Sequence, residues 1–171
     1  MNGVNAIREG IQWGTEILEM VMAGVTDEQA RWAPPGLANP IGALYAHAYL
    51  AADGIVHGML QGVPPLYAST WADKVGVEAP QMSISFEWAR GLQPDLAALR
   101  LYGQAVTEAI SAYTAKLGDD DLDRVIDLSG AGLGQRPVSW VLNALIAGHH
   151  NNMAGEISAL KGAQGAQGYP F

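Results

Sequence analysis

The sequence predicts an all-α protein: a four-helix bundle with a long connection between its second and third helices. Four segments of about 20 to 25 residues carry apolar side chains at intervals of three and four, which places those side chains on one face of a helix. Alternation typical of strands is confined to one short stretch. Amphipathic helices of this length bury their apolar faces against one another, and four of them form a bundle. The 171 residues fit one domain over 1–171.

The first helix has its apolar stripe over residues 7–25. Gly14 lies in this stripe, where the missing side chain would let another helix approach closely. Thr26 and Gln29 then have the spacing of a capping box, which predicts a short helical turn ending at two prolines.

The second long helix is expected to begin at Asn39, a good N-cap, with Pro40 in the first helical position. Gly62, followed by two prolines, ends it. The next segment, residues 63–90, has no sustained period. A connection this long is unusual in a compact domain and is often functional, for example as a lid.

The remaining elements follow in order. The third helix is expected to begin near Pro94 and to end at Gly118, and Arg124–Leu128 is a short β-prone piece. The fourth helix is expected to run from Pro137 to Lys161. The glycine-rich tail, residues 162–171, is expected to be extended and docked against the bundle or a second subunit.

Composition excludes several classes of function. The net charge of −8 argues against a nucleic-acid partner, which requires a basic face. There is no cysteine, so the chain has no disulfide, thiolate ligand or cysteine nucleophile. The apolar segments are shorter than the roughly 18 residues of a membrane span, and the start lacks the features of a signal peptide. We therefore expect a cytoplasmic protein with no membrane partner.

Polar residues interrupt two of the apolar stripes. His47 lies in the stripe of the second helix, and His149 and Glu156 lie in that of the fourth. Because an unpartnered buried polar group costs about 1–3 kcal/mol, we expect these groups to face one another, or a ligand, inside the bundle. Taken alone, His47 also fits a hydrogen-bonded core histidine. His150, rotated about 100° from the stripe, is expected at the surface or at an interface, and Asn152 borders the stripe.

A metal site at this position would lack a ligand. The residue one helical turn after His149 is Met153, whose thioether is a poor ligand for zinc or nickel. The chain therefore supplies two imidazoles where a catalytic zinc site has three protein ligands and an open position.

Three stretches of the chain together resemble the DinB-like superfamily of bacterial four-helix bundles. Residues 31–64 are similar to the family's second helix, with its histidine at His47, and residues 119–128 to the link before the last helix. Residues 138–170 are similar to the family's His-x-x-x-His-x-Gly-Glu-Ile pattern and its glycine-rich tail. Members with known activity use a divalent metal and a low-molecular-weight thiol, and they include mycothiol-dependent maleylpyruvate isomerase and bacillithiol transferases.

The resemblance implies a zinc, nickel or manganese ion held by one histidine of the second helix and two of the fourth. By position these ligands are His47, His149 and residue 153, which is methionine in this chain. Supporting roles would fall to three neighbours in the fourth helix, His150, Asn152 and Glu156.

Two functions are open on the sequence alone. One is a thiol-dependent S-transferase or isomerase that acts on a small electrophile with a bound divalent metal and a low-molecular-weight thiol. The other, motivated by Met153, is a metal-free member that binds a small-molecule ligand or serves as a structural dimer. A homodimer is expected in either case, because family members often pair and five tryptophans leave aromatic surface to cover.

Overall fold

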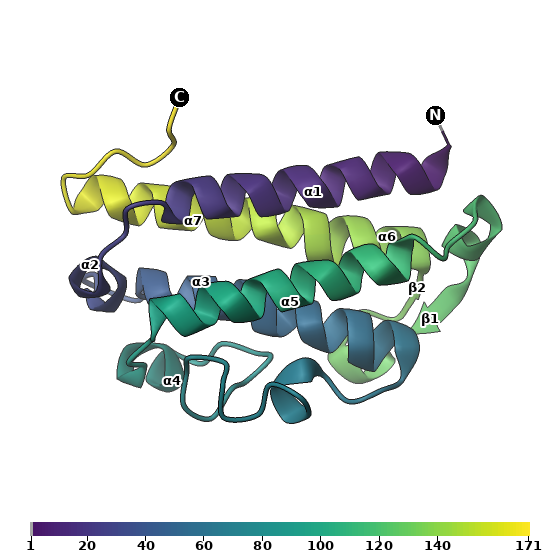
Figure 1. Cartoon of the computed structure of the whole chain (residues 1–171), viewed down its shortest axis with the longest axis horizontal. Helices are drawn as coiled ribbons and strands as arrows, with labels where there is room; N and C mark the ends of the chain where they lie inside the picture. Colours follow the sequence, from purple (N-terminus) through teal and green to yellow (C-terminus); the bar gives the residue numbers. More distant parts are fainter. Residues whose placement is uncertain (1) are drawn as a thin grey trace.

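A computed structural model describes residues 2–171 (Figure 1). Its α-helices are α1 (Gly3–Met22), α2 (Asp27–Arg31), α3 (Ile41–Asp53), α4 (Phe86–Gly91), α5 (Leu96–Thr114), α6 (Val138–Leu142) and α7 (Gly148–Ala163). Two π-helical segments extend the long helices: η1 (Gly54–Met59) follows α3, and η5 (Asn143–Ala147) joins α6 to α7. Short 3-10 turns lie at η2 (Leu66–Ala68), η3 (Asp119–Asp123) and η4 (Ser129–Ala131).

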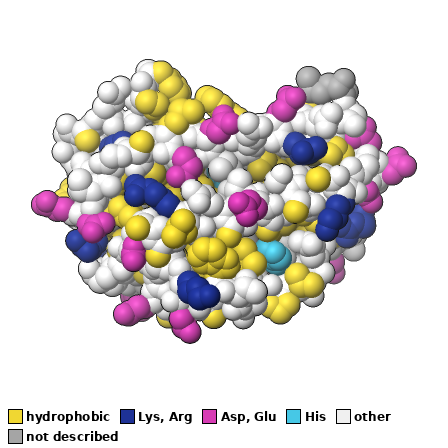
Figure 2. Space-filling view, in the orientation of Figure 1, with side chains coloured by type: hydrophobic (Ala, Val, Ile, Leu, Met, Phe, Trp, Pro, Cys, Tyr) yellow, Lys and Arg dark blue, Asp and Glu magenta, His cyan; other side chains and the backbone are white. Residues whose placement is uncertain are grey.

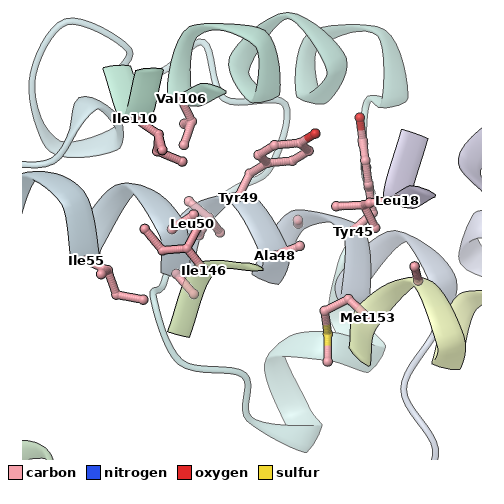
Figure 3. Close-up of a cluster of buried hydrophobic side chains, with 14 of the residues drawn as sticks. Leu18, Tyr45, Ala48, Tyr49, Leu50, Ile55, Val106, Ile110, Ile146 and Met153 are labelled. Atoms are coloured by element: carbon pink, nitrogen blue, oxygen red, sulfur yellow. The ribbon is translucent and has the colours of Figure 1, made fainter. Parts of the chain in front are cut away.

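Four rods pack side by side, which confirms the predicted helical bundle. They are α1, α3 with η1, α5, and α6 with η5 and α7 (Figure 1). The first rod packs along α7, and α3 contacts both α5 and α7. Every residue of α3 except His47 is buried, because this helix is apolar on all sides and occupies the centre of the bundle. Figure 3 shows part of the core around it.

The close approach predicted at Gly14 is confirmed. A Cβ atom at this position would lie 2.8 Å from the carbonyl oxygen of Ala147 and 3.3 Å from Cβ of His150. Glycine therefore allows α1 to pack directly on the junction of η5 and α7. The capping box of Thr26 and Gln29 is also present, at the start of α2.

The predicted start of the second helix is wrong by one position. Pro40 is the N-cap of α3, not its first helical residue, and no side chain caps this end. The third rod begins after Pro94 as expected, with the side chain of Asp95 capping α5 by accepting a hydrogen bond from the amide of Ala98.

The long connection over residues 63–90 is fastened to α3 by Asp53. This fully buried carboxylate accepts hydrogen bonds from the backbone amides of Leu66 and Tyr67 and from the hydroxyl of Tyr102, the last at 2.6 Å. Nδ1 of His57 lies 2.6 Å from the same carboxylate. Because both oxygens have two partners, the burial of the charge is compensated and the connection is held at a fixed place.

The β-prone piece before the last rod is confirmed as a strand, but its partner strand is not predicted by the sequence. Strand β1 (Val125–Asp127) pairs antiparallel with β2 (Gln135–Pro137). Gly132 and Gly134 take positive φ values of 73° and 66° in the loop between them, a conformation that favours glycine.

The fourth rod is not the continuous α-helix that the sequence predicts. The π-helical segment η5 contains one extra residue per turn, which moves the inward face of everything after it by one position. The buried residues of α7 are therefore His150, Met153, Ala154, Ile157 and Lys161. Two expectations are wrong for this reason: His150 is fully buried instead of at the surface, and Glu156 is exposed instead of in the apolar stripe.

No helix in the part of the chain that the structure describes is long and apolar enough to cross a membrane. Acidic and basic side chains are interspersed on the face shown in Figure 2.

Candidate functional site

His47 and His149 face each other between α3 and α7, as expected, although both are only partly buried. Their Nε2 atoms are 3.1 Å apart, and the rings are nearly perpendicular, at 88°, with centroids 4.8 Å apart. This arrangement is a hydrogen bond in which one neutral imidazole donates from Nε2 and the other accepts. Nδ1 of each ring is buried without a hydrogen-bond partner.

Burial keeps this pair neutral at physiological pH. Burial first, and the neighbouring His47 second, lower the pKa of His149 to about 4. Burial also lowers the pKa of His47, and the backbone of Met82 beside the ring partly opposes this effect. Two imidazoles in contact cannot both carry a charge, so their preferred state is the hydrogen-bonded neutral pair.

His150 lies on the next position of α7 but points elsewhere. Its Nδ1 is 3.2 Å from the hydroxyl of Thr15 on α1, and its ring packs edge to face against Tyr49 at 5.4 Å. Burial first, and His149 second, lower its pKa to about 4, against a smaller opposing effect of the Ala48 backbone. His150 is therefore a core residue behind the pair and not a member of it.

A pocket of about 350 Å³ lies beside His149. Four separate parts of the chain form it: the end of α3 with η1, the long connection over residues 63–90, the loop between β1 and β2, and the η5–α7 junction. Its lining is mostly apolar, and the residues are Ala51, Ile55, Met59, Met82, Leu133, Ala144, Leu145, His149 and Asn152. Its volume is in the range of sites that hold a small organic molecule.

Met82 links the long connection to this pocket. Its side chain packs directly on the backbone of Gly54, where a Cβ atom would overlap the thioether. Since Gly54 opens the π-helical segment η1, the sequence places a residue without a side chain at the point where the connection crosses the helix. The role of residues 63–90 in the site is thus to supply one wall, through Met82.

The remaining predicted residues are dispersed. Asn152 is exposed and lines the pocket with His149, whereas Glu156 is exposed and does not line it. Met153 is buried, at 8% exposure. Sequence reasoning missed Met82 and Leu133, which come from segments without periodicity, and no signal in the sequence marks them as pocket residues.

The spacing of the histidine pair is close to that of two ligands of the metal ion that the resemblance implies. Two nitrogen ligands of one tetrahedral zinc ion lie about 3.3 Å apart, close to the 3.1 Å between the two Nε2 atoms. However, no group of three or more His, Cys, Asp or Glu side chains within residues 2–171 is arranged to hold a metal ion. With a thioether at position 153, the donors present do not fit a three-ligand zinc, nickel or manganese site.

Comparison with known proteins supports the fold. The family model described as the DinB superfamily matches residues 11–155, which is most of the chain. The crystal structure of a conserved protein from Enterococcus faecalis is similar, with a TM-score of 0.76 and 20% sequence identity over 94% of this chain and 96% of that one. At this identity the likeness concerns the fold alone. No curated protein matches the chain.

Proposed function

Because the chain belongs to the DinB superfamily, we propose that it uses the family's bundle to bind a small, mostly apolar molecule beside the histidine pair. The observation that carries this proposal is the pocket of about 350 Å³ with His149 in its wall. Most of its lining is aliphatic or thioether, so the hydrophobic effect would supply most of the binding free energy.

The imidazole pair would supply the specificity. His149 is hydrogen-bonded to His47 and is neutral, so it can exchange its role of donor or acceptor with its partner without acquiring a charge. A ligand with one hydroxyl, carbonyl or similar polar group would bind that group near His149 and Asn152 and its apolar part against Met59 and Met82.

A thermal-shift screen with small apolar compounds tests this proposal. Compounds that raise the unfolding temperature of the native chain should lose their effect on Ala144→Leu, which extends a side chain into the pocket. Ala112→Leu is the matched control, because residue 112 is exposed on α5 and the same substitution there leaves the pocket intact. The proposal fails if no compound stabilises the native chain, or if the same compounds stabilise Ala144→Leu equally.

A second candidate function is a divalent-metal-dependent thiol S-transferase or isomerase. One observation favours it: the distance of 3.1 Å between the two Nε2 atoms is close to that of two ligands on one metal ion. Its weakness is Met153, the position at which the resemblance requires a third histidine.

Elemental analysis of purified, tag-free protein decides between the two candidates. If binding without metal is correct, the native chain carries much less than one zinc, nickel or manganese ion per chain, and Met153→His fills to about one. About one ion per native chain would instead support the metal-dependent enzyme, and assays with low-molecular-weight thiols would follow.

A further inference from the structure

A second hollow surface lies between α1 and α5, on the other side of α3 from the histidine pair. Tyr45 and Tyr49 are one turn apart and share a face of α3, whereas His47 points about 200° away from Tyr45. Two adjoining cavities, of about 340 and 320 Å³, lie between α1 and α5 and share Thr15 and Thr107 in their walls. We call these two cavities together the α1–α5 groove.

One end of the α1–α5 groove is built around the carboxylate of Glu19. Tyr45 and Tyr49 both donate their hydroxyl protons to Oε1 of this residue, at 2.9 and 2.5 Å. Figure 3 shows the two phenol rings on the same side of α3, with their hydroxyls directed away from Met153. Two buried donors fix the orientation of the carboxylate, and no described residue donates a hydrogen bond to its Oε2.

The charge at this end of the groove is unbalanced. Glu108 of α5 lines the same cavity as Glu19, and no lysine or arginine lines it. Within residues 2–171, Glu19 has no ion-pair partner within 4.0 Å. Arg100, whose charge reaches Tyr45, donates to the carbonyl of Met22 instead.

The other end of the groove combines an apolar wall with polar and charged side chains. Ile11 and Ile110 are buried in that wall, and the other lining residues are Arg8, Gln12, Thr15, Glu16, Thr107, Ser111 and Thr114. From these observations we infer that the α1–α5 groove binds a small organic ammonium ion with an apolar arm. The ammonium group lies between Glu19 and Glu108, and the arm lies along Ile11 and Ile110. The preorganised Oε2 atom of Glu19 accepts a charge-assisted hydrogen bond from the ammonium group.

Isothermal titration calorimetry of the full chain with hexylamine tests this inference. One hexylamine should bind per chain, and 1-hexanol and hexanoate should bind at least about tenfold more weakly, because a charged hydrogen bond is lost. Glu19→Gln keeps an oxygen for the two phenols but removes the charge, so it should weaken hexylamine about tenfold without affecting hexanol. Glu87→Gln, an exposed residue on α4, is the matched control.

A second pair of measurements locates the apolar arm. Ser111→Trp fills the apolar end from an exposed position and should weaken hexylamine more than ethylamine. Ala144→Leu, on the far side of α3, should leave hexylamine binding unchanged, which separates this groove from the pocket beside His149. Equal binding of hexylamine and hexanol, no effect of Glu19→Gln, or no heat with any amine would overturn the inference. Tight binding of calcium with no binding of amines would also overturn it.

Discussion

At the scale of single residues, the most unusual feature is a set of three neighbouring neutral histidines, of which His150 is fully buried and His47 and His149 are partly buried. His47 and His149 form a hydrogen bond with each other through their Nε2 atoms. The hydrogen-bond partner of His150 is the hydroxyl of Thr15. Nε2 of His150 has no hydrogen-bond partner. Any proton added to His150 would therefore be placed in the core, next to His149, with the hydroxyl of Thr15 as its one hydrogen-bonding side chain.

We predict that the protein loses stability as the pH falls from about 6.5 to about 4. The pKa of His150 is about 4 in the folded chain and 6.5 for a solvated histidine in the unfolded chain, so the unfolded chain binds more protons in this window. The free energy of unfolding then decreases as pH falls, by an amount on the order of 3 kcal/mol for this residue. Urea denaturation at several pH values measures it.

His150→Gln tests the assignment to this residue, because glutamine is polar but does not titrate. The loss of stability between pH 6.5 and 4 should shrink in this variant. Thr15→Val is the control, since it removes the hydrogen bond but keeps the imidazole and its titration. An unchanged pH dependence in His150→Gln would show that other groups cause it.

Sequence reasoning found the histidine pair but neither the buried carboxylate of Asp53 nor the partly buried one of Glu19. His47 and His149 are visible because each interrupts an apolar stripe, and stripes point inward. Glu19 shares α1 with two other glutamates, and its partners Tyr45 and Tyr49 come from another helix. Such a carboxylate looks solvated until the packing of the helices is known, because its partners are set by tertiary structure.

At the scale of elements, the four helices are predictable, but the inner face of the last one is not. Apolar spacing locates α1, α3, α5 and the fourth rod, since long periodic segments have few alternatives. The π-helical segment η5 has no recognisable signal in the sequence and moves the register by one position. That single step explains why His150 and Ile157 are buried and Glu156 is exposed.

Lys161 joins two of these elements at their ends. Its Nζ donates to the carbonyl of Val21 at 2.7 Å and to that of Ala23 at 3.3 Å, at the C-terminus of α1. A cation at this end of a helix satisfies free carbonyls and favours the helix dipole. We predict that Lys161→Met lowers the free energy of unfolding by about 1–2 kcal/mol, measured by urea denaturation at pH 7.

The matched control for this prediction is Lys116→Met, because Lys116 is exposed just after α5. It should change stability by less than about 0.5 kcal/mol. Equal effects of the two substitutions would mean that the hydrogen bonds of Lys161 to α1 add nothing to the effect of losing one positive charge.

At the scale of the whole molecule, several large apolar side chains remain on the surface. Trp13 and Met20 are 49% and 37% exposed and lie two turns apart on the same face of α1. In the tail, Tyr169 stacks on Phe171 with ring centroids 5.8 Å apart. The tail runs back along α7, since a Cβ atom at Gly168 would overlap Ser158. In Figure 1 the tail follows the end of α7 and lies beside α1, the helix that carries Trp13 and Met20.

We predict a homodimer that buries this side of the bundle. Sedimentation equilibrium of the native chain should give twice the monomer mass at micromolar concentration, and Trp13→Glu should give the monomer, because it places a charge in the apolar contact. Leu37→Glu is the control, since Leu37 is 84% exposed in the loop before α3. A monomer mass for the native chain at all concentrations would contradict the prediction.

The extra residue in η5 has a consequence for any attempt to exchange the fourth helix with that of a relative. Residues before Asn143 and after Ala147 follow two helical phases offset by one step. A donor helix without this offset would need one residue added between these points to be grafted successfully. Without it, the position of Ile157 would turn toward water and that of Glu156 toward the core. The buried face of the grafted helix would then be rotated by about 100° over two turns.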